Sequence, residues 1–323
     1  MAEEREVELT NLDQPLFDGA EATKRDLVAY LEAVQGPLLE GLRGRPLSVI
    51  RALRGRRPFM QKNVPRYLPA WVRTVTIWAE ASRRDVTYAL CDDWPTLKWF
   101  ANQRAVEYHP ALMRVDPAPP AQTHLVLDLD PPEGEPFAAV AAVALLVKEA
   151  LEGAGLRGAV KTSGAKGIHV LVPIAQPAHP EEIAAATRAL AARAERLDPS
   201  IATTAYVLAE RGGRVFVDST RAYGATVVAA YSPRLRPGAT VSFPLAWEAL
   251  AGADPRDFTI RTAPALLDGG DPWAALMPAP QALPAELVEE GRAIPVARVA
   301  AMHEGKRRAR ARREAEGDAG SAR

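Results

Sequence analysis

Cysteine is almost absent from this chain, and its absence limits the chemistry that the chain can perform. The 323 residues include one cysteine, Cys91, so no disulfide can form within the chain. A structural zinc site is also excluded, because such sites need several cysteine or histidine ligands at close spacing and the five histidines are scattered. Any metal bound here should therefore be a hard cation held by carboxylate oxygens.

Long apolar runs are missing as well. No stretch approaches the roughly 20 apolar residues that a membrane-spanning helix needs. Residues 1–8 are acidic and contain no apolar segment typical of a secretion signal. We therefore expect a cytoplasmic protein with no membrane partner. Neither sign of charge is in excess, since 40 basic and 40 acidic residues give a net charge of zero. Binding depends on the local field, so a neutral total still allows a basic groove.

Hydrophobic periodicity predicts a mixed α+β fold, because candidate strand pairs lie close together in the sequence. We expect helices over residues 23–40, 94–107, 136–152 and 180–196, with short helices near 245–251 and 284–292. We expect strands over residues 46–53, 71–78, 123–130, 159–163, 168–174, 214–218 and 225–232. The basic segment 296–314 predicts a helix, either a solvated helix end or a non-specific DNA contact, and disorder is expected beyond it.

Two aspartates stand at the end of the strand that precedes Pro131. Side chains alternate along a strand, so Asp128 and Asp130 share one face, and the leucines beside them share the other. Two like charges side by side repel unless they share a cation. Phosphoryl transfer uses a pair of cations, about 3.5–4 Å apart, to hold the attacking and leaving oxygens. Asp218, at the end of another predicted strand, is a candidate third ligand. On spacing alone, solvated aspartates at strand ends remain the alternative explanation.

A candidate phosphate-binding turn follows in the sequence. Residues 161–169 read Lys-Thr-Ser-Gly-Ala-Lys-Gly-Ile-His. The two glycines allow the backbone to approach a ligand closely, and the hydroxyls and lysines suit phosphate oxygens. The segment is not a Walker A loop, because that spacing is absent and a strand follows instead of a helix. A solvated hairpin with a structural histidine is the alternative that composition leaves open.

Taken in order, these segments resemble the polymerase domain of bacterial ATP-dependent DNA ligase D, within the archaeo-eukaryotic primase superfamily. The resemblance rests on Asp-Leu-Asp-Pro at 128–131, the turn at 161–169 and Val-Phe-Val-Asp at 215–218. Shorter matching segments lie at 9–13, 23–24, 61–63, 71–74, 107–110, 231–234 and 243–247. The likeness covers roughly residues 8–262.

The resemblance implies roles for individual positions. The catalytic metal ligands would be Asp128, Asp130 and Asp218. The residues around the incoming nucleotide would be Ser163, Lys166, His169, His109, Lys62, Arg221 and Arg234. The DNA contacts would be Lys24, Arg51 and Phe59, with Lys24 engaging a 5′-phosphate on the downstream strand.

Some positions depart from the family pattern, and they lie in the part that would contact DNA. Gln14 stands where a second phosphate-binding lysine is usual, and Met60 replaces one of two aromatic residues that can stack on bases. The segment 50–58 is shorter than usual, and Ala111 replaces a common tryptophan. These departures concern the recognition of DNA ends and gaps, and they leave the catalytic carboxylates intact.

The resemblance also implies an architecture. The fold would be a primase-polymerase fold, with a central mixed or antiparallel sheet that carries the active site, flanking helices and an N-terminal α/β subdomain. Residues 1–107 would form the N-terminal part with DNA contacts, residues 108–292 the catalytic core, and residues 293–323 a basic helix and tail. We expect a stand-alone relative without ligase or nuclease domains.

The implied activity is template-dependent nucleotidyl transfer to primer 3′ ends in short-gap filling or end-joining DNA repair. The implied cofactors are two divalent cations, with manganese preferred to magnesium, and the substrates are NTPs, preferred to dNTPs. The implied partners are DNA with a primer-template, gap or end, the protein Ku and a separate ligase. We expect a monomer associated with the nucleoid.

Two other functions are compatible with the same residues. A metal-dependent phosphoesterase or nuclease could use the same carboxylates. A catalytically silent DNA-binding repair module is the second alternative, and it offers no reason to keep three acidic side chains together.

Overall fold

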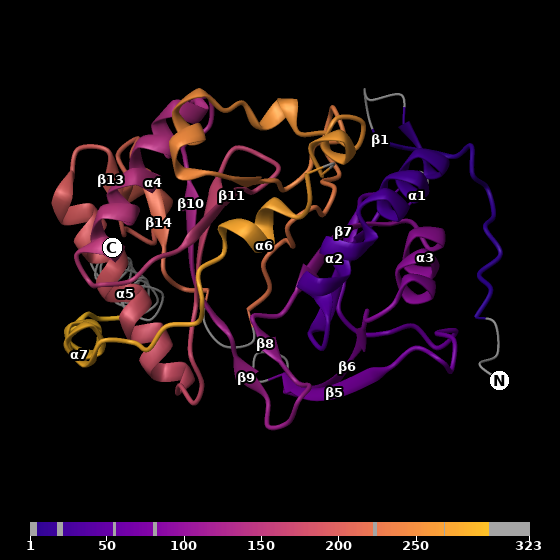
Figure 1. Ribbon diagram of the computed structural model, residues 1–323, viewed down its shortest axis with the longest axis horizontal. Helices are drawn as coiled ribbons and strands as arrows, with labels where there is room; N and C mark the ends of the chain where they lie inside the picture. The colour runs from indigo at the N-terminus through magenta and orange to yellow at the C-terminus, as the bar shows by residue number, and fades with distance from the viewer. Residues whose placement is uncertain are drawn as a thin grey trace, which may run out of the picture.

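The structure is a computed structural model that describes residues 5–17, 22–53, 56–79, 83–221, 225–267 and 269–296. The predicted basic helix and tail, from residue 297 onward, lie outside this part of the chain. Figure 1 shows two halves side by side, each built around its own sheet. Among the described residues, no helix combines the length and the apolar character that a membrane crossing would need.

One half contains a six-stranded sheet in the order β13-β14-β10-β12-β11-β15. Its neighbours are antiparallel except for the parallel pair β13 and β14. This sheet is the predicted mixed sheet. Its strands are β10 (His124–Asp130), β11 (Ala159–Thr162), β12 (Ile168–Pro173), β13 (Ala202–Thr203), β14 (Val215–Asp218) and β15 (Pro244–Leu245).

Alternation along β10 separates the core from the candidate site. Leu125, Leu127 and Leu129 are fully buried against α4 (Phe137–Glu152) and α5 (Pro180–Leu197), and the aspartates project from the opposite face. Helix α7 (Ala285–Ala293) packs on α5 at very close range (Figure 1). A Cβ added at Gly291 would lie 1.8 Å from the carbonyl oxygen of Ala185, so only glycine permits this helix contact.

The other half contains a five-stranded sheet in the order β4-β3-β6-β5, with β7 also paired to β3. Helices α1 (Lys24–Ala33), α2 (Gln35–Leu42) and α3 (Trp94–Asn102) pack in this half (Figure 1). The strands are β3 (Pro46–Arg51), β4 (Phe59–Gln61), β5 (Thr74–Ala79), β6 (Arg84–Leu90) and β7 (Ala105–Pro110).

Each half has its own hydrophobic core, but the chain does not divide cleanly between them. The core around α1 to α3 also contains Tyr231, Val241 and Phe243 from the second half of the sequence. The predicted boundary after residue 107 falls inside β7. The division into 1–107, 108–292 and 293–323 stays a prediction.

The remaining elements are short. Strands β1 (Pro15–Phe17) and β2 (Ala22–Thr23) pair with each other, as do β8 (Met113–Arg114) and β9 (Ala121–Gln122). The helix α6 (Pro272–Leu276) and the 3-10 turns η1 (Leu208–Glu210), η2 (Trp247–Gly252), η3 (Pro255–Asp257) and η4 (Ala263–Leu267) complete the described chain.

The helix predicted over 94–107 is wrong in its second half. Helix α3 ends at Asn102, and Arg104 turns the chain with a φ of 63°. Residues 105–110 then form β7, which is buried along its whole length. A strand buried on both faces lacks the alternation that identifies a half-exposed strand, so periodicity did not separate it from the helix.

Three further expectations also differ from the structure. The predicted helix 23–40 is two helices, because the backbone departs from helical geometry at Val34 (φ −107°, ψ 10°), just before Gly36 and Pro37. The predicted strand 225–232 is not a strand, and Thr226 forms an isolated bridge with Ala111. The predicted helix near 245–251 is the 3-10 turn η2.

Candidate active site

Four charged or polar side chains form a row across the six-stranded sheet. In the register of the sheet, Asp218 on β14 lies opposite Asp128 on β10, and Asp128 lies opposite His169 on β12. His169 in turn lies opposite Lys161 on β11. Paired residues on antiparallel strands project to the same face, so sheet pairing alone brings together residues that lie up to 90 positions apart in the sequence.

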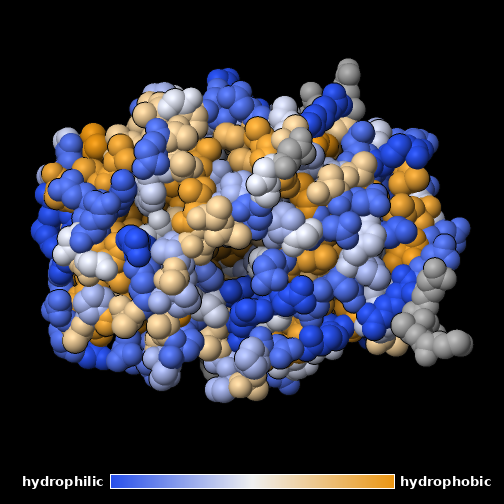
Figure 2. All heavy atoms as spheres, in the orientation of Figure 1, coloured by the Kyte–Doolittle hydropathy of each residue, from blue (hydrophilic) through white to orange (hydrophobic). Residues whose placement is uncertain are grey.

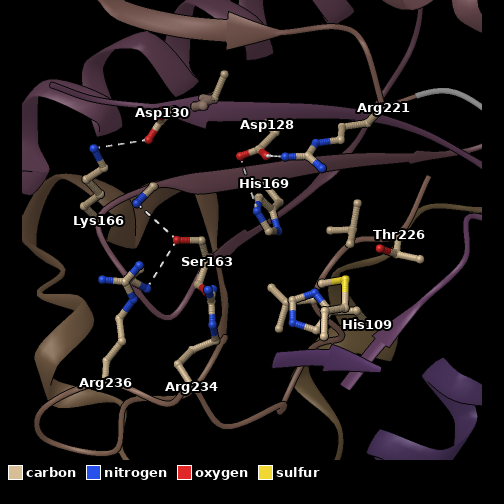
Figure 3. A pocket seen from close by; sticks show the side chains of 16 residues that line it. His109, Asp128, Asp130, Ser163, Lys166, His169, Arg221, Thr226, Arg234 and Arg236 are labelled. Carbon is tan, nitrogen blue, oxygen red and sulfur yellow. Dashed lines mark hydrogen bonds and ion pairs between the residues drawn. The ribbon is translucent and has the colours of Figure 1, made fainter. Parts of the chain in front are cut away.

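Basic side chains contact each aspartate of the site. Arg221 Nη2 lies 3.0 Å from Asp128 Oδ2, and Arg221 Nε lies 3.5 Å from Asp218 Oδ2. Lys166 Nζ lies 3.4 Å from Asp130 Oδ1, and Arg211 Nη1 lies 3.5 Å from Asp130 Oδ2. Figure 3 shows Asp128 between His169 and Arg221, and Lys166 reaching toward Asp130.

The charges around Asp128 decide the protonation state of its carboxylate. Burial alone would raise the pKa of Asp128, but His169, Arg221 and Lys161 outweigh burial and hold that pKa at about 2. His169 Nε2 lies 3.3 Å from Asp128 Oδ1. Burial and the neighbouring Lys161 lower the pKa of His169 to about 4. At neutral pH, therefore, Asp128 is an anion beside a neutral imidazole.

The three aspartates offer the oxygen ligands that a hard divalent cation prefers. As the side chains stand in the described residues, no three acidic, histidine or cysteine groups are close enough to hold one metal ion. The side chain of Asp130 is 46% exposed and contacts Lys166. Asp128 and Asp218 face each other directly, so a rotation of Asp130 and a release of Arg221 would complete the ligand set. The donors fit, because every ligand is a carboxylate oxygen.

The turn between β11 and β12 has the conformation that its glycines require. Gly164 has a φ of +69°, and a Cβ there would lie 2.6 Å from Arg234 Cγ. A Cβ at Gly167 would lie 2.5 Å from the carbonyl oxygen of Leu129. Ser163 Oγ accepts hydrogen bonds from the backbone N–H groups of Ala165 (3.2 Å) and Gly167 (3.1 Å), so this hydroxyl holds the turn closed.

A buried carboxylate, Glu107, organises the other wall of the site. Its Oε2 accepts from Arg234 Nε at 3.0 Å and lies 2.9 Å from His109 Nε2, and its Oε1 accepts from the Leu235 N–H at 2.9 Å. Arg234 Nη1 also donates to the carbonyl oxygen of Ser163. Glu107 therefore joins β7 to the phosphate-binding candidate turn. The sequence alone did not predict this role. The signal that could have indicated it is a carboxylate within a run of mostly apolar residues.

The two walls enclose a cavity of about 310 Å³ (Figure 3). Most of the predicted catalytic and nucleotide-binding residues line it, namely Asp128, Asp130, Ser163, Lys166, His169, His109, Arg221 and Arg234. Met60, Thr226 and Arg236 line it as well, and they were not predicted as site residues. Lys62 is exposed and does not line this cavity. Carboxylates and basic side chains line the cavity together, which suits a metal-bound polyphosphate.

The predicted DNA-contacting residues lie outside this cavity. Lys24 is 2% exposed, and its Nζ donates to the carbonyl oxygen of Thr10 at 2.6 Å. The guanidinium of Arg51, a buried residue, donates to Gln103 O and Gln61 Oε1, both at 2.9 Å. Phe59 is 41% exposed and is the one of the three whose side chain is largely accessible. The DNA contacts of all three stay predictions.

A second, larger cavity of about 1290 Å³ lies near the N-terminal residues. Its basic lining comes from Arg56, Arg57 and Arg104, which outnumber the acidic Asp13, and its polar lining includes Asn11 and Gln14. The face shown in Figure 2 mixes hydrophilic and hydrophobic residues and is hollowed near its centre, between the two halves. Clustering of arginines in a groove produces a local positive field that the neutral net charge conceals.

Comparisons with known proteins agree with this geometry. Residues 23–273 match the family described as the LigD primase-polymerase domain. The chain is 32% identical over 261 residues to the bifunctional non-homologous end joining protein LigD of Bacillus subtilis, covering 79% of this chain and 41% of that protein. It is 33% identical to the multifunctional non-homologous end joining protein LigD of Mycobacterium bovis, covering 77% of this chain and 34% of that protein. The chain thus spans less than half the length of these relatives.

A solved structure shows the same fold. The polymerase domain of Mycobacterium tuberculosis Ligase D in complex with DNA superposes with a TM-score of 0.77 at 31% sequence identity. The match covers 84% of this chain and 98% of that one. The expected α+β primase-polymerase fold is therefore confirmed.

Proposed function

This chain belongs to the LigD primase-polymerase family, and from that premise we propose that it is a template-dependent nucleotidyltransferase that extends primer 3′ ends. The observation that carries the proposal is the row of Asp218, Asp128 and His169 beside the glycine turn of Ser163 and Lys166. Asp128, Asp130 and the donors for a triphosphate thus line one cavity, and Asp218 lies opposite Asp128 on the sheet. The two alternatives, a nuclease and a silent module, are not favoured by this family.

The three aspartates would hold divalent cations, as the sequence analysis predicted for Asp128, Asp130 and Asp218. When bound, such cations lower the pKa of an attacking hydroxyl and neutralise charge on the phosphates. The reaction forms a bond between the primer 3′-oxygen and the α-phosphorus and breaks the bond to the β-phosphate, and pyrophosphate leaves. We propose manganese as the preferred cation and ribonucleotides as the preferred substrates, on the basis of the family resemblance.

The other cavity residues would bind and orient the nucleotide. Lys166 Nζ lies between the carboxylates of Asp130 and Glu133, at 3.4 and 3.1 Å, so it can exchange these partners for phosphate oxygens. Arg221 bridges two aspartates and would turn its guanidinium toward the phosphates as cations take its place. His109 and Arg234 are held by Glu107, so they would form a rigid wall behind the nucleotide.

The repair context follows from the relatives named for non-homologous end joining. We propose that the chain fills short gaps or extends ends in DNA repair, with Ku and a separate ligase as partners, and that it acts as a monomer. The groove lined by Arg56, Arg57 and Arg104 would hold the DNA, because these guanidinium groups line a cavity large enough for a strand.

Primer extension tests the proposed activity directly. Labelled primer-template would be incubated with manganese and nucleoside triphosphates, and we expect extension by the native chain and a loss of at least about 1000-fold with Asp128→Asn. Glu152→Gln is the matched control, because Glu152 lies on the exposed side of α4 and should leave the rate unchanged. Shortening of the primer without extension would favour the nuclease instead, and equal extension by Asp128→Asn would contradict the proposed site.

A further inference from the structure

A buried lysine lies at one end of the row of four side chains across the sheet. Lys161 on β11 is 1% exposed, and its Nζ lies 2.8 Å from His169 Nδ1 and 2.7 Å from Ser242 Oγ. Ser242 is fully buried as well. Burying an amine costs free energy unless its hydrogens find acceptors, and these two contacts supply them. The presence of a lysine at a position that an apolar residue could fill therefore needs an explanation beyond core packing. The family resemblance assigned no role to this lysine.

Lys161, Ser242, His169 and Asp128 form a series of hydrogen-bonded groups. The groups at the two ends of this series fix the direction of the hydrogen bonds within it. Ser242 Oγ lies 2.7 Å from the carbonyl oxygen of Thr162, which can only accept, so the hydroxyl donates there. Its lone pairs then accept from Lys161. At the other end, the Asp128 carboxylate can only accept, so His169 Nε2 must carry a hydrogen.

The contact between Lys161 and His169, in the middle of this series, then has one favoured arrangement of hydrogens. With its hydrogen on Nε2, His169 has only a lone pair on Nδ1, and Lys161 Nζ, which carries hydrogens whether or not it is charged, lies 2.8 Å from that lone pair. Lys161 donates to Nδ1, and His169 is held as the neutral tautomer with its hydrogen on Nε2. That nitrogen belongs to a side chain that lines the cavity, beside Asp128 (Figure 3).

We propose that Lys161 is a positioning residue that acts through His169, keeping its Nε2–H directed toward the bound nucleotide. The proposal rests on the proposed function, because this hydrogen would pass from Asp128 to a phosphate oxygen of a nucleoside triphosphate when cations engage the Asp128 carboxylate. The opposite tautomer would present a lone pair to both Asp128 and the phosphate, and both contacts would be repulsive. A hydrogen bond to a charged oxygen is among the stronger ones in proteins, so its loss should weaken nucleotide binding substantially.

Kinetics of a lysine variant provide the first test. In Lys161→Met, which keeps the length and removes the donor, we expect the nucleotide KM to rise about ten- to a hundredfold while kcat changes by only a few fold. Lys148→Met is the matched control, because Lys148 lies on α4 away from the cavity and should retain the native KM. A folded Lys161→Met protein with native KM would overturn the proposal.

A double-mutant cycle separates a positioning role from a merely structural one. If Lys161 acts through His169, then adding Lys161→Met to His169→Ala should change the KM by less than about twofold. Additive effects would show that the lysine acts by another route and would contradict the proposal. If Lys161→Met fails to fold, Ser242→Ala replaces it in both measurements, since it removes the acceptor that anchors Nζ, and a smaller rise in KM is expected.

The tautomer itself can be observed without any turnover. In the native chain labelled with ¹⁵N-histidine, the imidazole resonances of His169 should show hydrogen on Nε2 and none on Nδ1, and this pattern should weaken in the lysine variant. Hydrogen on Nδ1 in the native chain would overturn the proposal. This spectrum can be recorded without any activity. A chain that failed to extend primers would therefore refute the proposed function, and the spectrum would still show whether Lys161 sets the tautomer of His169.

Discussion

At the scale of single residues, Glu107 is the carboxylate that holds two basic side chains in one wall of the candidate site. Its side chain is 5% exposed, and it contacts His109 and Arg234. Burial alone would raise the pKa of Glu107, but the hydrogen bond from His109 and the charge of Arg234 outweigh burial and lower it. A carboxylate with a lower pKa in the folded state stabilises the fold at pH values above its ordinary pKa of 4.5. This stabilisation is lost as the pH falls through the pKa that the carboxylate has in the folded state.

We therefore expect Glu107→Gln to lower the free energy of unfolding at pH 7 by about 3 kcal/mol, because Arg234 would be left buried without its counter-charge. The difference between native and variant chains should shrink as the pH falls below 4.5, where the carboxylate of the unfolded chain takes up a proton, and it should be lost below the lower folded-state pKa. Urea denaturation at several pH values measures both effects. Glu152→Gln, on an exposed helix surface, should shift stability by less than about 0.5 kcal/mol. A difference that grew toward low pH would contradict the sign of this argument.

At the scale of elements, the turn between β11 and β12 is the most tightly constrained connection of the site. Gly167 approaches the backbone of Leu129, which lies between the two aspartates of β10, so the turn and the strand cannot move independently. A side chain at this position would push the turn away from β10 and would carry Ser163 and Lys166 with it.

We expect Gly167→Ala to lower stability by about 2 kcal/mol and to raise the nucleotide KM at least tenfold, because its Cβ would meet backbone that cannot give way. Gly36→Ala is the matched control, since a Cβ at Gly36 meets nothing within 4 Å, and alanine in helix α2 should be neutral or stabilising. Thermal melts and primer-extension kinetics on the two variants make the comparison. Native kinetics in Gly167→Ala would show that the turn does not position the nucleotide.

Local patterns were sufficient to predict the elements that carry the carboxylates. The strand over β10 and the hairpin of β11 and β12 follow from alternation and from the glycines between them. The segment 225–232 also has strand-like composition, yet it forms irregular contacts along β7. Val227 donates to the carbonyl of Pro110 and Ala229 to that of Tyr108. These contacts depend on how the two halves meet, which a local pattern does not contain.

The same limit explains which site residues could be predicted. The aspartates and the 161–169 turn are local motifs, and the family resemblance assigned them roles. The contact between Glu107 and Arg234 joins residues 127 positions apart, and that between Lys161 and Ser242 joins residues 81 positions apart. Charged side chains buried at such separations are recognisable only once the sheets are in place.

At the scale of the whole molecule, charge is distributed unevenly although its sum is zero. Arg56, Arg57 and Arg104 line the cavity of about 1290 Å³, while Asp128 and Asp130 line the smaller one together with Lys166, Arg221, Arg234 and Arg236. DNA held in the larger groove would release counterions from its phosphates, so its affinity should fall steeply with salt.

We expect Arg104→Gln to weaken the binding of gapped DNA and to reduce the slope of log affinity against log salt by about 0.9, the value for one phosphate contact on duplex DNA. Arg157→Gln, in a different cavity, should leave the slope unchanged. Fluorescence anisotropy across a salt series gives both slopes. Gapped DNA with and without a 5′-phosphate should also be compared, and equal affinity for the two would exclude a 5′-phosphate contact in this groove.

The link from Glu107 through Arg234 to Ser163 joins the two hydrophobic cores at the nucleotide cavity. A ligand that touches both walls binds only when both cores are folded, and its binding free energy is therefore added to the stability of both at once. Saturating nucleoside triphosphate should convert any two-step melting of this protein into a single, higher transition. Occupancy by substrate would thus make the molecule unfold as one cooperative unit.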